Sequence, residues 1–260
     1  MKKRGQVTVF IILGIIILLS VVAFISIKSW IITQEANVEE QKTLSAVSTG
    51  EATKSYVESC IESTTRNAIL DNSLSGGYFV LPKKSTTNLF DNVPYYYQNK
   101  NDLYPTNNVI AEEIAQYVDE MLFLCINDFR TFREQGYEIA SQNPVSEASI
   151  SPQKIILRTN FPITIQIGTI TKDISDFIVE VTATEFYQDI LTAREMVKNQ
   201  EGDKICLTCL SNLAVENDLF INILPSIENT YIIDITDNNY IINEQNYRLR
   251  FALQFDEITE

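Results

Sequence analysis

The residues with the clearest spacing for chemistry are the two cysteines of Cys206-Leu-Thr-Cys209. Thiols three positions apart lie on one face of a helix, and the start of a helix lowers the pKa of the first thiol toward reactivity. The intervening Leu-Thr differs from the Gly-Pro of thioredoxin-like enzymes, and no predicted strand of a βαβ unit precedes the pair. We therefore predict a structural disulfide between Cys206 and Cys209 on a short helix, with a redox-active bridge and metal ligation as the alternatives. Ile205, Leu207 and Leu210 are expected to pack this segment into the domain.

The chain contains no histidine. This excludes Ser-His-Asp and Cys-His nucleophile systems, histidine-ligated zinc and histidine acid-base chemistry. The 34 Asp and Glu residues leave two-carboxylate chemistry open, but no pair among them stands out. The eight glycines are scattered and form no phosphate-binding loop. We therefore predict a non-enzymatic protein with no catalytic residue, no cofactor and no metal.

The other two cysteines, Cys60 and Cys125, lie on apolar stripes of two predicted helices. Four cysteines allow three pairings, and the stripes favour Cys60 with Cys125 if both helices face one core. Closing that loop adds about 4 kcal/mol in the chain-entropy model. All four cysteines follow the apolar N-terminal segment, which suits a compartment where disulfides persist.

Hydrophobic residues recurring every 3.6 positions predict the helices that would carry these cysteines. Four helices are expected, over residues of about 51–70, 107–135, 185–200 and 206–215. The second is the longest, with Glu112 and Glu113 expected in its first turn, where negative charge suits the helix dipole. Gly136 supplies its stop.

After Pro144 the hydrophobic period changes to two, which predicts strands. Strands are expected over residues 155–157, 163–167, 177–182, 219–224, 231–236 and 247–255. We expect a break at residues 160–162 and a turn at Asp237-Asn238-Asn239. Helices and strands arrive in blocks, which favours an α+β domain with helices packed on a largely antiparallel sheet.

Residues 76–108 are expected to form an extended, turn-rich connection that contains Tyr95, Tyr96 and Tyr97. Two interpretations are open for these tyrosines. They form a stacking platform for sugars, or they pack over the core of their own domain. The second is favoured, because a connection of this length inside a compact domain needs an anchor.

The N-terminus carries a predicted membrane span. Three basic residues precede an uncharged run from Gly5 to Ile27, and Lys28 follows. As a helix, Val7–Ile27 would rise about 31 Å, which matches a hydrocarbon core of roughly 30 Å. The cations before the span predict a cytoplasmic tail and an extracellular remainder. We expect a tail and transmembrane anchor over 1–30, a stalk over 31–50 and an acidic ectodomain over 51–260.

The net charge of this ectodomain limits the classes of partner that it can bind. The whole chain has a formal charge of −14, and the part after the anchor holds 16 basic against 34 acidic residues, a charge of −18. Such a surface repels nucleic acid and anionic lipid. No nucleic-acid partner is expected, and the expected partners are the membrane itself and envelope or surface proteins.

Lys-Lys-Arg-Gly-Gln followed by an apolar helix resembles the class III signal of archaeal type IV pilin-like proteins. The resemblance implies that a membrane peptidase cuts between Gly5 and Gln6. Pilins usually carry Glu at the fifth position after the cut, where this chain has Phe10, and this difference bears on filament assembly more than on cleavage. A plain signal anchor is the alternative, because spanning alone explains the composition.

Short stretches further along widen the resemblance. Tyr56 to Cys60, Val93 to Tyr97 and Tyr247 to Ala252 resemble segments of uncharacterised single-span archaeal surface proteins, and this likeness covers most of the chain. It implies a membrane-anchored surface protein, and we expect a structural or adhesive role. The alternatives are an envelope thiol-disulfide oxidoreductase that uses Cys206 and Cys209, and a type IV pilin-like filament subunit.

Overall fold

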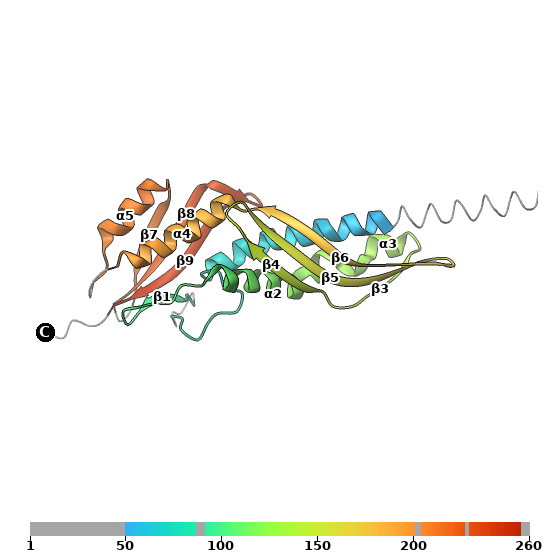
Figure 1. Cartoon of the computed structure of the whole chain (residues 1–260), viewed down its shortest axis with the longest axis horizontal. Helices are drawn as coiled ribbons and strands as arrows, with labels where there is room; N and C mark the ends of the chain where they lie inside the picture. The colour runs from blue at the N-terminus through green and yellow to red at the C-terminus, as the bar shows by residue number, and fades with distance from the viewer. Residues whose placement is uncertain (1–49, 87–91, 201–203, 227–228, 256–260) are drawn as a thin grey trace, which may run out of the picture.

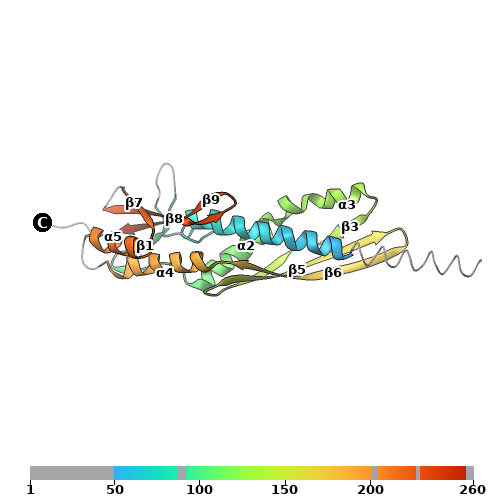
Figure 2. The ribbon, with the colours of Figure 1, turned by 90° about the horizontal axis from the view of Figure 1, so that it is seen from above.

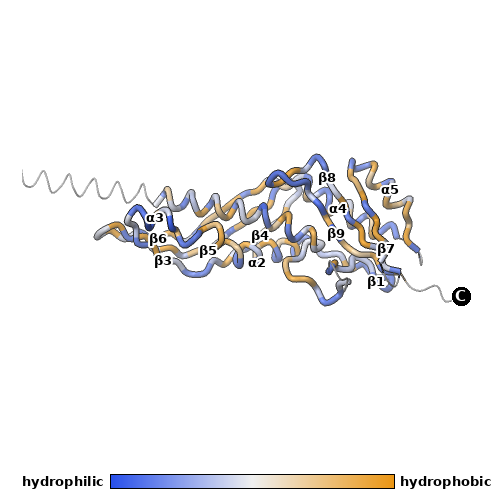
Figure 3. The backbone as a smooth tube through the Cα atoms, turned by 180° about the vertical axis from the view of Figure 1, so that it is seen from behind, coloured by the Kyte–Doolittle hydropathy of each residue, from blue (hydrophilic) through white to orange (hydrophobic). Residues whose placement is uncertain are grey.

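Two β-sheets lie toward opposite ends of an elongated body (Figure 1). The computed structural model describes residues 50–86, 92–200, 204–226 and 229–255, and Figure 2 shows the same elongation from above. One hydrophobic cluster includes residues of both sheets and of the helices, and hydrophobic residues recur along the whole body (Figure 3). The predicted α+β class is confirmed, although the strands form two sheets rather than one.

The predicted N-terminal features precede residue 50. The anchor, the stalk up to residue 49, and the predicted cleavage site at Gly5 and Gln6 all lie outside the described residues. Within the described ranges, no helix combines the length and the apolar character needed to cross a membrane.

The first described element is a helix over residues 50–74, called helix 50–74 below (blue to cyan in Figure 1). Its buried face includes Val57, Ile61 and Ala68, at the spacing of one helical stripe. The helix ends where the Gly77 N–H donates to the Asn72 carbonyl (2.7 Å). Gly76 and Gly77 have φ of 61° and 83° there, a conformation that glycine adopts without strain. The predicted helix over 51–70 is confirmed and continues to residue 74.

The second helix, α2 (Asn107–Ile126), starts at Thr106, whose side chain accepts from the Val109 N–H (3.3 Å). It ends nine residues before the predicted Gln135, and the prediction of one continuous helix is wrong. A 3-10 turn, η1 (Asn127–Phe129), and a short helix, α3 (Arg130–Glu134), follow. All three residues of η1 have positive φ, and this reversal places Phe129 in the core, 2% exposed.

Glu112 and Glu113 do not lie in the first turn of α2, which contains no acidic residue. The helix begins at Asn107, so both fall one turn further along. Glu113 has a different partner instead: its carboxylate accepts from the backbone N–H groups of Phe79 (2.8 Å) and Val80 (2.9 Å). The predicted stop at Gly136 is confirmed for α3, after which Gly136 has a φ of 90°.

The four-stranded sheet contains β3 (Glu138–Ser141), β4 (Val145–Ile150), β5 (Lys154–Ile167) and β6 (Ile170–Thr182), all antiparallel. β6 pairs along one side of β5, and β3 and β4 share the other side. The predicted break at 160–162 is wrong, because β5 runs through Pro162 as one strand with a bulge. Pairing with β4 ends at Asn160 and pairing with β3 starts at Ile163, so Pro162 faces no ladder position that needs its missing N–H.

The five-stranded sheet has the order β2-β1-β9-β8-β7. Its strands are β1 (Tyr95–Gln98), β2 (Asn101–Asp102), β7 (Phe220–Pro225), β8 (Thr230–Ile242) and β9 (Gln245–Gln254). Only the β1–β9 pair among these is parallel. The predicted turn at 237–239 is wrong: those residues lie in β8 beside a bulge, and the chain reverses at Asn243 and Glu244, which both have positive φ.

Two helices accompany this sheet. α4 (Thr184–Lys198) buries Phe186, Ile190 and Val197, the spacing from which it was predicted. α5 (Leu207–Glu216) packs against β7 and α4. Both predicted helices are therefore confirmed to within two residues at their ends.

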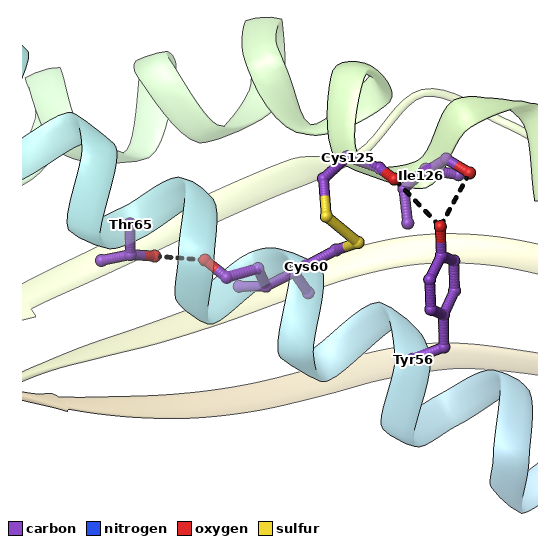
Figure 4. Close-up of a disulfide and its surroundings, with 6 residues drawn as sticks. Tyr56, Cys60, Thr65, Cys125 and Ile126 are labelled. Carbon is purple, nitrogen blue, oxygen red and sulfur yellow. Dashed lines mark hydrogen bonds between the residues drawn. A yellow bond between two sulfur atoms is a disulfide. The ribbon is translucent and has the colours of Figure 1, made fainter. Parts of the chain in front are cut away.

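The disulfide Cys60–Cys125 joins helix 50–74 to the end of α2, with Cα atoms 5.5 Å apart, as predicted (Figure 4). The Tyr56 hydroxyl lies one turn earlier and donates toward the carbonyl oxygens of Cys125 (2.9 Å) and Ile126 (3.2 Å). These carbonyls belong to the last turn of α2 and have no partner further along that helix. The covalent bond and the tyrosine thus fix the same helix end.

Replacing both cysteines of this bridge should lower stability substantially. In the chain-entropy model a bridge that spans 65 residues contributes about 4 kcal/mol, whereas one that spans three residues contributes about 2 kcal/mol. We expect Cys60→Ala with Cys125→Ala to lower the free energy of unfolding about twice as much as Cys206→Ala with Cys209→Ala, measured by urea denaturation of the purified chain. Equal losses in the two double variants would contradict this account of the bridge.

Candidate functional site

The pair Cys206 and Cys209 lies at the start of α5, and the two residues are bonded to each other, with Cα atoms 5.3 Å apart. Cys206 is the N-cap residue, and its sulfur accepts from the Cys209 N–H (3.2 Å). The Cys206 N–H donates to Oε1 of Gln200 (2.8 Å). The predicted pairing on a short helix is confirmed, and after reduction the same N–H would stabilise a Cys206 thiolate.

The surroundings of this bridge differ from the prediction. Ile205, Leu207 and Leu210 were expected to pack the segment into the domain, but Leu207 is 53% exposed and Ile205 is only partly buried. Leu210 is fully buried, because α5 turns a single face toward β7. Both cysteines of this bridge are half-buried, so a thiol in solution can reach either of them, whereas in the other bridge Cys125 is half-buried and Cys60 is 2% exposed.

A metal site was the third reading of the cysteines. The Cys60–Cys125 and Cys206–Cys209 bridges occupy all four sulfurs. In the ranges that the structure describes, no three Cys, Asp or Glu residues are grouped so as to hold a metal ion.

The adjacent tyrosines pack inward. Tyr96 is 1% exposed, its hydroxyl donates to the Gly76 carbonyl (2.9 Å), and its ring stacks on Phe251 at 4.4 Å between centroids. Tyr97 is buried as well and packs against Phe255. Burial raises the pKa of Tyr96. The sugar-platform interpretation is therefore wrong, and the core-packing interpretation is confirmed.

A buried carboxylate that the sequence did not single out lies on the inner face of α4. Asp189 is 4% exposed, and its Oδ2 has no hydrogen-bond partner in the described structure. Burial, the charge of Asp237 and then that of Glu185 raise the pKa of Asp189 to about 8. Nearby Tyr240 also has a hydroxyl without a partner among the described residues, and burial raises its pKa to about 12. Asp189 is therefore neutral over most of the physiological pH range.

The second feature that sequence reasoning missed is a groove between α2 on one side and, on the other, β4 with residues 141–144 that precede it. It consists of two adjoining cavities of about 650 and 440 Å³ that share Asp119. We call it the α2–β4 groove. Its lining includes five acidic residues, Glu112, Asp119, Glu120, Asp128 and Glu147, and among the described residues no Lys or Arg lines either cavity. The acidic residues were visible on a predicted helix, but β4 was not predicted, so nothing placed Glu147 opposite them.

No protein-family model, no curated protein and no solved structure matches the chain significantly.

Replacing Asp189 by Asn should change the pH dependence of stability. The pKa of Asp189 is raised from 3.8 to about 8, so the folded state holds a proton that the unfolded state loses. Its contribution to stability is complete below pH 3.8 and declines as pH rises to about 8, by up to about 1.4 kcal/mol per pH unit.

The Asp189→Asn variant lacks this decline. We expect its free energy of unfolding to exceed that of the wild type by an amount that grows between pH 4 and pH 8. Denaturant titrations across that range provide the measurement, and Glu195→Gln, an exposed change on the same helix, is the control. A difference that stays constant with pH would show that Asp189 is ionised in the folded protein.

Proposed function

We propose that this chain is a membrane-anchored surface protein whose ectodomain makes structural or adhesive contacts in a cell envelope of the archaeal type. The predicted span and its flanking charges support the anchoring. Two disulfides are compatible with an oxidising compartment.

The observation that carries this proposal is the direction in which the chain enters the body. Helix 50–74 starts beside the β5–β6 hairpin, where Glu51 lies 3.9 Å from Lys172. The five-stranded sheet lies at the opposite end (Figure 1). An anchor before residue 50 would therefore hold one end and present the other, which suits a protein that reaches for partners. The filament-subunit alternative stays a prediction, because the segment on which it depends precedes the described residues.

The oxidoreductase alternative is favoured by a separate observation. Cys206 caps α5, accepts a backbone N–H at its sulfur and is half-buried, which are the features that make a cysteine reactive. A structural role follows equally from the short loop and the packed Leu210. The two roles differ in reduction potential, because structural bridges lie below about −300 mV and dithiol enzymes between about −270 and −120 mV.

The location is tested by protease treatment of intact cells. We expect protease to remove the ectodomain while the segment before residue 30 stays with the membrane. The Ile16→Arg change should reduce membrane insertion, because Arg at the centre of a span costs about 2.5 to 3.5 kcal/mol on the translocon scale. Protection of the ectodomain in cells that remain intact would refute the orientation, and recovery in the soluble fraction would refute the anchor.

The role of Cys206–Cys209 is tested by redox titration of the purified chain with alkylation and peptide mapping. We expect Cys206–Cys209 to be reduced first, because both of its residues are half-buried, whereas in the other bridge Cys125 alone is half-buried and Cys60 is buried. A potential below about −300 mV would support a structural bridge. A potential above about −250 mV, with insulin-reductase activity that Cys206→Ser abolishes, would establish the oxidoreductase instead.

A further inference from the structure

We propose that the α2–β4 groove is a docking site for a basic, apolar-containing segment of a partner protein. The inference rests on the proposed contact function only in assigning the partner to the envelope. The groove itself is a property of the folded domain and can be tested without cells.

Most of the acidic residues that line the groove have no ion-pair partner among the described residues, whereas Asp128 pairs with Arg133 at 3.1 Å. None of the ion pairs between described residues involves Glu112, Asp119, Glu120 or Glu147. Glu120 accepts a hydrogen bond from Gln116 (2.9 Å), which leaves its charge in place. These four carboxylates, which have no ion pair among the described residues, favour a ligand with several positive charges.

Asp119 is the group that most needs such a ligand. It lines both cavities, and its Oδ1 is buried without a hydrogen-bond partner in the described structure. Burial raises the pKa of Asp119, and hydrogen bonds to Ser146 oppose that rise. A Lys ammonium or an Arg guanidinium in the groove would supply a counter-charge to the half-buried Asp119 carboxylate.

The larger cavity also has an apolar wall. Phe123 lines it and is 64% exposed, an unusual position for a large aromatic side chain. Ile126, Phe129 and Phe161 continue this wall. The amide side chains of Gln142 and Asn143 line the same cavity and could bond a peptide backbone. A small polycation would use the carboxylates and leave Phe123 uncovered, so the wall favours a peptide segment.

The elements that form the walls of the groove are held in place by contacts within the domain. The Cys60–Cys125 bridge and the Tyr56 hydroxyl hold the end of α2 that carries Phe123. β4 pairs with β5 along its whole length, from Val145 to Ile150. A preformed groove loses little conformational entropy on binding.

The test uses the full chain in a non-ionic detergent and a fluorescein-labelled peptide, Gly-Lys-Phe-Lys-Lys-Leu-Lys. Two matched peptides replace Phe and Leu by Ser, or every Lys by Glu, and spermine serves as a competitor. We expect saturable binding of the first peptide, measured by fluorescence anisotropy. Binding should weaken as NaCl rises from about 50 to about 500 mM, because the Debye length shortens to a few ångströms.

Variants locate the binding. Asp119→Asn with Glu120→Gln should weaken it about tenfold, and Phe123→Ser about fivefold. The double variant Glu112→Gln with Glu120→Gln changes exposed residues only. It therefore tests the charge of the groove even if a change at Asp119 disturbs folding. The controls are Glu195→Gln with Glu216→Gln, which remove the same charge from α4 and α5, and Val215→Ser, at a residue 81% exposed. They should change binding by less than about twofold.

Three results would overturn the proposal. The first is no saturable binding of the peptide, and the second is an equal loss in the groove variants and the controls, which would indicate attraction to the overall negative charge. The third is spermine or the Ser-containing peptide binding as tightly as the first peptide, which would make the groove a site for small polycations. Each result concerns the purified chain, so a failure here is distinguishable from a failure of the cellular location test.

Discussion

The bond between Cys60 and Cys125 links the two helices on which both sheets depend. Helix 50–74 contributes to the hydrophobic cluster that includes residues of both sheets, and α2 packs on β4. The bridge and Tyr56 act within one turn of each other, so the end of α2 is fixed covalently and by its carbonyl groups (Figure 4). The chain then reverses through three residues with positive φ, a strained conformation that persists only where its surroundings hold it. The tethered end of α2 provides such surroundings.

The sequence predicted those parts of the fold that depend on neighbouring residues, and it failed where tertiary contacts decide the structure. α4 and α5 were predicted because their apolar residues recur at helical spacing, and Cys60 and Cys125 were paired because both lie on such stripes. The break after Ile126 has no proline or glycine to announce it, and its cause is tertiary burial of Phe129. At Pro162 the error was the opposite, because a break was predicted where the strand continues. A strand tolerates proline where no neighbouring strand needs its N–H, and here that depends on where β3 and β4 end.

The same distinction applies to the candidate sites. The spacing of Cys206 and Cys209 is a local motif, so both their pairing and their helix could be predicted, whereas the exposure of Leu207 depends on how α5 lies against β7. The α2–β4 groove has no local motif, because its walls come from segments that are brought together only in the fold. Asp189 is one acidic residue among 34 in the sequence, and only its burial on the inner face of α4 distinguishes it.

Buried carboxylates in this structure differ in protonation because their surroundings differ. Asp234 in β8 is buried and bonds the guanidinium groups of Arg248 and Arg250, whereas Asp189 has no such partner and takes up a proton instead. Other basic residues pair with nearby acids, as Lys154 does with Glu180 at 2.7 Å. The excess negative charge therefore attracts cations to the whole surface and selects no particular partner. Selection requires a place where unpaired charge, an apolar wall and a half-buried carboxylate coincide, since a partner that matches only the charge gains little from the other two. In the described part of the molecule, the α2–β4 groove combines all three around Asp119 and Phe123.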